Sequence, residues 1–196
     1  MADIRAAVIG ASGYSGEELI RLLLRHPSVD LRIITSRKEA GKNISEIFPR
    51  FADSSLKFSA PDVPEIAMSC DVAFLALPHG LAAEFAIPLL ESKVKVIDIS
   101  ADFRIRSTEK YKEYYGADHP SPELLKKAVY GLPERYREQI RKADLIACPG
   151  CYPTSIILPV APLLDAGLVS PENIIVSADS GVSGAGRKVD LAYIFP

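Results

Sequence analysis

The stretch that decides the fold is Ile4-Arg5-Ala6-Ala7-Val8-Ile9-Gly10-Ala11-Ser12-Gly13-Tyr14-Ser15-Gly16. Its apolar run, Ile4–Ile9, predicts a buried strand, and residues 15–25 place leucine and isoleucine on one side, which predicts a helix. Glycines between a strand and a helix permit a tight turn, a close approach of the backbone to a pyrophosphate and close packing of the helix on the strand. The free N–H groups of the helix N-terminus attract the same phosphates. The stretch therefore predicts a dinucleotide-binding loop, with an ordinary glycine turn as the alternative.

Apolar runs alternate with helical stretches along the rest of the chain. We predict strands at residues 31–35, 72–77, 94–99, 144–148 and 174–179, and helices at 81–91, 107–115, 122–128 and 153–166. Pro159 and Pro162 would bend or break the last of these helices. Strands that recur with helices between them imply right-handed crossovers, and hence a parallel sheet of the α/β class.

The composition is that of an ordinary globular protein. The chain has 196 residues, of which 48% are apolar and 24% charged, and this excludes disordered and fibrous proteins. A net charge of -2 leaves no basic surface for nucleic acid, and the longest apolar run, at 156–164, is too short to cross a membrane. The first residues do not resemble a signal peptide, and three cysteines are too few for a disulfide framework, so we expect a cytoplasmic location.

The residues after the second predicted strand select the cofactor. An Asp or Glu about 20 residues beyond the glycines would bind the ribose 2′-hydroxyl of NAD. This chain has Thr35-Ser36-Arg37-Lys38 at that point. A hydroxyl and two cations suit a 2′-phosphate, so we predict NADP(H). Glu39 opposes this interpretation, and a solvated basic turn is the alternative.

A second candidate site is Cys148-Pro149-Gly150-Cys151-Tyr152-Pro153-Thr154, between a predicted strand and a predicted helix. A helix N-terminus favours the thiolate, which is the nucleophilic form of cysteine, so Cys151 is the nucleophile candidate. Cys70 is interpreted as a small buried apolar residue. The Cys148–Cys151 spacing also fits a redox pair or half of a zinc site. No second pair of Cys or His has a suitable spacing for zinc, and we expect no metal.

Six motifs occur in an order typical of one family. They lie at residues 10–16, 77–80 (Leu-Pro-His-Gly), 97–104, 129–134, 149–154 and 180–187. Together they resemble the N-acetyl-γ-glutamyl-phosphate reductases, NADPH-dependent oxidoreductases of arginine biosynthesis whose superfamily includes aspartate-semialdehyde dehydrogenase. The resemblance implies a Rossmann-type parallel sheet followed by the start of an α+β catalytic and dimerisation domain. The corresponding boundaries would be 1–148 for the dinucleotide-binding domain and 149–196 for the start of the substrate domain.

The resemblance also implies a covalent mechanism. Cys151 would attack the acyl phosphate, phosphate would leave, and hydride from NADPH would reduce the resulting thioester to the semialdehyde. Arg104 would bind the phosphate or carboxylate of the substrate, with a surface ion pair to Asp102 or Glu109 as the alternative.

The expected cofactor residues fall in four segments. These are the glycine loop, the end of the second strand, the Leu-Pro-His-Gly turn and the glycine-rich loop at 180–187, which could instead be a plain turn. The residues are Gly10, Ser12, Gly13, Tyr14, Ser15, Gly16, Ser36, Arg37, Lys38, Pro78, His79, Ser183, Gly184 and Gly186. Glu17 and Glu18 complement the helix dipole, and we expect them to point away from the phosphates.

Members of the family are considerably longer than this chain. Their catalytic histidine lies in a segment beyond position 196, so the resemblance implies that this chain is the N-terminal portion and turns over weakly or not at all by itself. We expect a small acyl-phosphate substrate, a homo-oligomer (dimer or tetramer), and neither nucleic acid nor membrane as a partner. The alternatives are a related acyl-phosphate reductase of lysine biosynthesis and a non-catalytic NADP-binding module.

Overall fold

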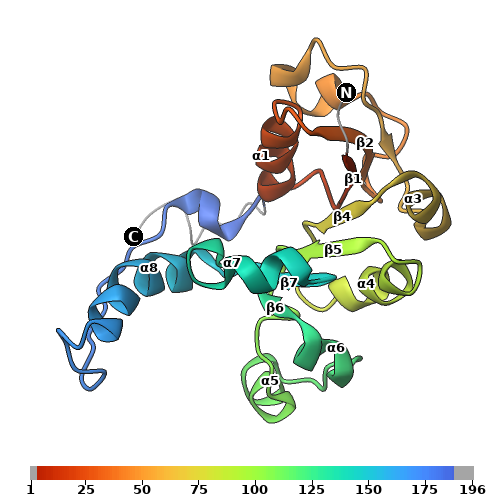
Figure 1. Ribbon diagram of the computed structural model, residues 1–196. Helices are drawn as coiled ribbons and strands as arrows, with labels where there is room; N and C mark the ends of the chain where they lie inside the picture. The colour runs from red at the N-terminus through yellow and green to blue at the C-terminus, as the bar shows by residue number, and fades with distance from the viewer. Residues whose placement is uncertain (1–3, 188–196) are drawn as a thin grey trace.

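A parallel sheet forms the centre of the molecule (Figure 1). The computed structural model describes residues 4–187, in which the strand order is β3-β2-β1-β4-β5-β7-β6 and every neighbouring pair is parallel. The strands are β1 (Ile4–Ile9), β2 (Val29–Thr35), β3 (Phe58–Ser59), β4 (Val72–Leu75), β5 (Lys95–Asp98), β6 (Val129–Tyr130) and β7 (Leu145–Ala147). The predicted α/β class and Rossmann-type sheet are therefore confirmed.

Helices cover both faces of this sheet. One face packs against α1 (Tyr14–Leu23), the short α2 (Ile44–Ile47) and the 3-10 turn η1 (Pro49–Phe51), and the other packs against α3 (Val63–Ser69) and α4 (Ala82–Glu91). The remaining helical segments are α5 (Thr108–Tyr115), α6 (Pro122–Lys127), α7 (Pro133–Lys142), α8 (Cys151–Asp165) and the 3-10 turn η2 (Val182–Ala185).

Alternate residues of β1 enter two separate apolar cores. Ala6 and Val8 pack in the core that contains Ile20 of α1, whereas Ala7 and Ile9 pack in the core on the opposite face. All four β1 residues are completely buried. Successive side chains of a strand point to opposite faces, so a run with no polar residue is the pattern of a strand covered on both sides.

The strand order reverses between β1 and β4. From β1 the chain first builds outward through β2 and β3, and then returns to add β4, β5 and β7 on the other side of β1. In open parallel sheets, ligands bind outside the carboxyl ends of the strands at such a reversal. The loops that follow β1 and β4 therefore form the expected binding edge.

Most predicted elements are present. The strands and helices predicted through residue 148 all occur, with ends that differ by at most two residues. Five elements were not predicted, namely β3, β6, α2, α3 and α7. β3, β6 and α2 have only two to four residues, which is too few to show an apolar period, and α3 has seven. α7 is mostly polar and buries no side chain.

The two predictions for the last described segment had different outcomes. The helix predicted at 153–166 begins earlier, at Cys151, and is interrupted at neither Pro159 nor Pro162. The strand predicted at 174–179 is wrong, because this segment has no regular structure and Ile175 is 93% exposed. Within residues 4–187 no strand lies beside it, and β-branched residues favour a strand only where a neighbouring strand and a covered face exist.

A buried carboxylate ends β5. Asp98 is fully buried, and its Oδ1 accepts the N–H of Ser100 at 2.9 Å, whereas its Oδ2 has no hydrogen-bond partner within residues 4–187. Burial raises the pKa of Asp98 to about 6, and the nearby carboxylate of Asp102 adds to the shift. The folded protein therefore holds a proton on Asp98 at pH values where the unfolded chain has lost it.

This difference predicts a pH-dependent stability. Between about pH 4 and pH 6 folding takes up a proton at Asp98, so its contribution to the free energy of unfolding falls as pH rises through this window. Asparagine cannot ionise, so the Asp98→Asn variant should lack this part of the pH dependence. Its free energy of unfolding should fall by roughly 3 kcal/mol less than that of the wild type across this window, as measured by urea denaturation at several pH values. Carboxyl groups that do not interact with Asp98 titrate equally in both proteins and cancel in the difference. Parallel pH profiles for the two proteins would contradict a raised pKa at Asp98.

Candidate functional site

The predicted site residues follow four neighbouring strands. The glycine loop follows β1, the Pro78-His79-Gly80 turn follows β4, Arg104 lies in the loop after β5, and Cys151 lies in the turn after β7. The carboxyl ends of parallel strands share one edge of the sheet. Segments separated by more than 130 residues are therefore brought to the same edge.

Two glycines of the loop are required by close contacts. Gly10 has a φ of 81°, and a Cβ added there would lie 2.5 Å from the carbonyl oxygen of Ala76, which follows β4. A Cβ on Gly16 would lie 2.6 Å from the carbonyl oxygen of Ala11. Any side chain at these positions would push the loop away from β4 or lift α1 from the loop.

The first N–H groups of α1 are available to a ligand. Gly13 is the N-cap residue and provides no side-chain cap, so the first N–H groups of α1 have no capping acceptor. A Cβ on Gly13 would meet nothing within 4 Å. Free N–H donors beside open space are the features that a pyrophosphate needs at a helix N-terminus.

A cavity of about 710 Å³ joins the glycine loop to three distant segments. Its predicted lining residues are Gly10, Ser12, Gly13, Tyr14, Ser15, Ser36, Arg37, Lys38, Pro78, Ser183, Gly184 and Gly186. Gly16 and His79 do not line it, because Gly16 packs α1 against the loop and the His79 ring contacts Asp102 and Tyr115 instead. The cavity is also lined by residues outside the predicted set, namely Glu39, Ile47, Pro61, Ala76, Leu77, Leu81, Phe85 and Arg187.

The end of β2 places a hydroxyl and two cations at this cavity. Ser36 Oγ lies 2.9 Å from Ser12 Oγ, which links the end of β2 to the glycine loop. Arg37 donates to Glu84 Oε1 at 2.6 Å, and its guanidinium lies over the ring of Phe85. Lys38 is 90% exposed in its side chain. The opposing Glu39 is bound by Lys42 at 2.7 Å, which offsets its charge.

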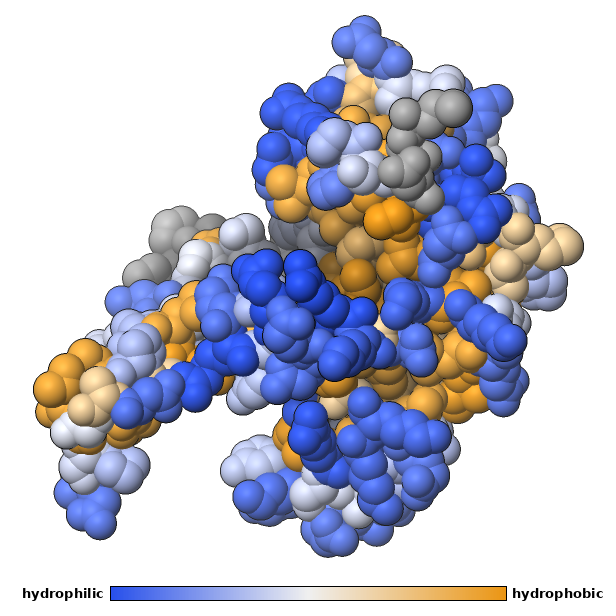
Figure 2. Space-filling model, in the orientation of Figure 1, coloured by the Kyte–Doolittle hydropathy of each residue, from blue (hydrophilic) through white to orange (hydrophobic). Residues whose placement is uncertain are grey.

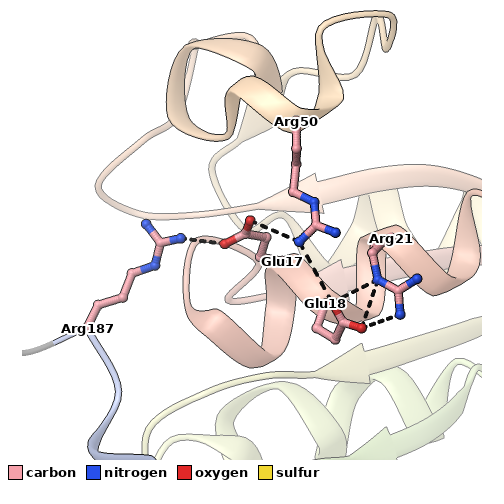
Figure 3. A network of polar contacts seen from close by, with 5 residues as sticks. All are labelled: Glu17, Glu18, Arg21, Arg50 and Arg187. Atoms are coloured by element: carbon pink, nitrogen blue, oxygen red, sulfur yellow. Dashed lines mark hydrogen bonds and ion pairs between the residues drawn. The ribbon is translucent and has the colours of Figure 1, made fainter. Parts of the chain in front are cut away.

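The carboxylates of Glu17 and Glu18, near the start of α1, are bound by arginines (Figure 3). Glu17 pairs with Arg187 at 2.6 Å and with Arg50 at 3.6 Å, and Glu18 pairs with Arg21. Neither glutamate lines the cavity. Their charges are therefore offset by partners outside the glycine loop.

Asp102 organises the turn after β4. This buried carboxylate accepts the N–H groups of Gly80 and Ala82 at 2.7 and 2.8 Å, and it lies 2.7 Å from His79 Nδ1. The His79 ring also stacks on Tyr115, with 4.2 Å between centroids. From sequence, Asp102 was expected only as an alternative ion-pair partner of Arg104, because no motif reveals its backbone partners.

Cys151 is the first residue of α8 and is exposed. Arg104 lies beside its turn, where Nε donates to the carbonyl oxygen of Cys148 at 2.7 Å and Nη2 donates to that of Ile99 at 2.9 Å. Arg104 Nη1 faces Gly150, where an added Cβ would lie 3.2 Å away. The alternative ion pair of Arg104 with Asp102 or Glu109 is not present in the described structure. Cys151 does not line the 710 Å³ cavity but lies along the same sheet edge.

The other two cysteines are poor nucleophiles. Burial raises the pKa of Cys70 to about 11, and burial together with the charge of Asp98 raises that of Cys148 to about 11. Across residues 4–187 no three His, Cys, Asp or Glu side chains are grouped as metal ligands would be. Within the same residues, no helix has both the length and the apolar character to span a membrane.

Comparison with known proteins identifies the family. Residues 5–143 match the semialdehyde dehydrogenase NAD-binding domain, and residues 151–196 match the semialdehyde dehydrogenase dimerisation domain. Two similar proteins are named N-acetyl-gamma-glutamyl-phosphate reductase. The one from Akkermansia muciniphila is 52% identical over 100% of this chain and 57% of its own length. The one from Acinetobacter baylyi is 50% identical over 98% of this chain and 56% of its own length. These matches confirm the resemblance that the motifs indicated.

The chain spans just over half the length of these curated relatives. Among solved structures, aspartate semialdehyde dehydrogenase II from Vibrio cholerae has the same fold, with a TM-score of 0.68 at 24% identity over 95% of this chain and 49% of that one. The NAD-binding domain model alone covers most of the sequence. The chain therefore belongs to the semialdehyde dehydrogenase family.

Proposed function

We propose that this chain belongs to an NADPH-dependent reductase that converts N-acetyl-γ-glutamyl phosphate to the corresponding semialdehyde and releases phosphate. The observation that carries this proposal is the whole-chain identity of about 50% to proteins with that name. The cavity supports it independently, because it combines a glycine loop with basic residues at the end of β2. We further propose a dinucleotide-binding domain over 1–148 and the start of the substrate domain at 149.

The residues around the cavity fit NADP(H). The free N–H groups at the start of α1, with Ser12 and Ser15, would bind the pyrophosphate, and Ser36, Arg37 and Lys38 would bind the 2′-phosphate. The loop that contains Ser183, Gly184 and Gly186 would form the wall near the nicotinamide. When bound, the cofactor supplies the hydride that reduces the acyl group.

Cys151 would form the covalent bond to substrate. Its Sγ, as the thiolate, attacks the acyl carbon, the carbon–oxygen bond to phosphate breaks, and inorganic phosphate leaves with the bonding pair. Gly150 caps α8 without a side chain, so the first turn offers free N–H donors next to the sulfur. Arg104 holds the carbonyl of Cys148 with Nε, and its Nη1 is directed at the Gly150 turn, where it can bind a substrate phosphate or carboxylate.

The chain is also proposed to form a homo-oligomer, a dimer or tetramer. Apolar side chains gather on the arm formed by α8 and the residues that follow it (Figure 2). Leu163, Leu168 and Val182 are all exposed there, and residues 151–196 match the dimerisation domain of the family. A second copy would bury this apolar surface. All three cysteines are free thiols, which fits the cytoplasm as the proposed location.

The proposed 2′-phosphate site can be tested by cofactor discrimination. Replacing Arg37 and Lys38 with Ala should raise the Kd for NADPH by about 10- to 100-fold, because charge-assisted hydrogen bonds to phosphate are lost. The Kd for NADH should change less than about threefold, since NADH has no such group. Titration of nicotinamide fluorescence measures both constants. The control is Arg25→Ala, which removes an arginine that does not line the cavity. An equal loss for both cofactors would contradict the assignment.

Selective alkylation tests the nucleophile. At neutral pH Cys151 should react with iodoacetamide at least about tenfold faster than Cys70 or Cys148, because thiols with a pKa of about 11 are almost fully protonated. Peptide mass spectrometry gives the three rates, and N-acetyl-γ-glutamyl phosphate should slow only that of Cys151.

Exposure alone also speeds alkylation, so a matched control is needed. The variant with Cys151→Ser and Ser155→Cys places an exposed thiol one turn further along α8, away from the helix N-terminus. Its thiol should react about tenfold more slowly than Cys151. Equal rates without protection by substrate would favour a non-catalytic NADP-binding module.

A further inference from the structure

Arg187 connects the end of the described chain to the helix that follows the glycine loop. Its Nη2 donates to Glu17 Oε2 at 2.6 Å. The guanidinium also lies over the rings of Tyr14 and Phe48, at 4.8 and 4.7 Å from their centroids. One side chain thus makes an ion pair and two cation–π contacts with residues at least 139 positions away in the sequence.

Glu17 is well placed to receive this arginine. Its side chain is only 17% exposed, and it is shared with Arg50 of η1 at 3.6 Å (Figure 3). Glu17 therefore joins three segments, α1, η1 and the loop at 182–187. An ion pair that is partly shielded from water, with stacked aromatic rings, resists screening better than an exposed pair.

The loop at 182–187 has no other distant polar contact within the described residues. Residues 168–186 make only local hydrogen bonds, such as Gly184 N–H to Gly181 and Gly186 N–H to Ser183. Their side chains are exposed. Among the polar contacts of the described residues, the Arg187–Glu17 pair is the one that links this loop to α1.

The same loop forms a wall of the cofactor cavity. Ser183, Gly184, Gly186 and Arg187 line the cavity together with the glycine loop, whereas Glu17 does not line it. Arg187 itself lines the cavity, but its guanidinium is bound to Glu17, which does not, and lies over the rings of Tyr14 and Phe48. Direct contact of Arg187 with a cofactor phosphate is the competing role, and the variants below separate the two.

We propose that Arg187 is a positioning residue: by binding Glu17 and packing on Tyr14 and Phe48, it holds the 182–187 loop against the glycine-loop helix and so slows release of the bound cofactor. This inference rests on the proposed function in that the ligand is NADP(H). Arg187 thereby differs from the proposed cofactor-binding residues, because it acts on the cofactor by holding the loop. The ion pair also joins the proposed dinucleotide-binding domain to the segment that belongs to the dimerisation domain.

The experiment compares Glu17→Gln, Arg187→Gln, Arg187→Lys and the double Gln variant in the full 196-residue chain. Stopped-flow displacement of NADPH should show a dissociation rate about tenfold higher in both single Gln variants, with an association rate within about twofold of wild type. The double variant should equal either single variant, because both remove one interaction. Arg187→Lys keeps the ion pair and should recover part of the loss. Arg21→Gln, which breaks the Glu18 pair on the same helix, should leave both rates unchanged.

Two results would overturn the proposal. Additive effects of the two single substitutions would show that they act separately, and normal release from Glu17→Gln with fast release from Arg187→Gln would show direct contact of Arg187 with the cofactor. If the wild-type chain does not bind NADPH, the proposed function fails, but the loop contact is still tested by hydrogen exchange without ligand. Faster exchange at residues 180–187 in Glu17→Gln then supports the contact, and unchanged exchange overturns it.

Discussion

The close approach of backbone to backbone at Gly10 and Gly16 is the constraint on which the binding edge depends. A Cβ at either position would come within 2.6 Å of a carbonyl oxygen, in one case from the loop after β4 and in the other from the glycine loop itself. Because both glycines lack a side chain, α1 begins close to β1 and its first N–H groups face the cavity. The strand order then brings the other parts of the site to the same edge, since it reverses beside β1.

The remaining contacts of the site follow a common arrangement, in which a side chain from one segment binds the backbone or the charge of another. Asp102 binds the N–H groups of the turn after β4, and Arg104 binds the carbonyl of Cys148 before the cysteine turn and that of Ile99 after β5. Asp102 is almost completely buried, so its hydrogen bonds are made without competition from water. The loops that would contact cofactor and substrate are therefore positioned by charged groups that need not react themselves.

The sequence was informative where a property is local. The glycine loop, the continuous apolar strands and the helix that begins near Cys151 each follow from neighbouring residues, and most of the predicted cofactor residues line one cavity. The strand predicted at 174–179 was wrong because strand formation needs a partner strand, which a local apolar run cannot supply. The partners of Glu17, Arg104 and Asp102 lie up to 170 positions away in the sequence. Only the folded chain specifies such pairs, because they depend on how the elements are arranged in space.

The two prolines in the interior of α8, Pro159 and Pro162, have a consequence for any surface that packs on this helix. A proline has no N–H, so Pro159 and Pro162 leave the carbonyl oxygens of Ser155 and Leu158, four residues earlier, without their helical donors. Water can satisfy these oxygens while the helix is exposed. A purely apolar partner would desolvate them at a cost of roughly 1 to 3 kcal/mol each. A stable interface on this side of α8 therefore has to combine apolar side chains with two hydrogen-bond donors, one turn apart. A partner that fits the shape of the helix but lacks these donors would bind more weakly.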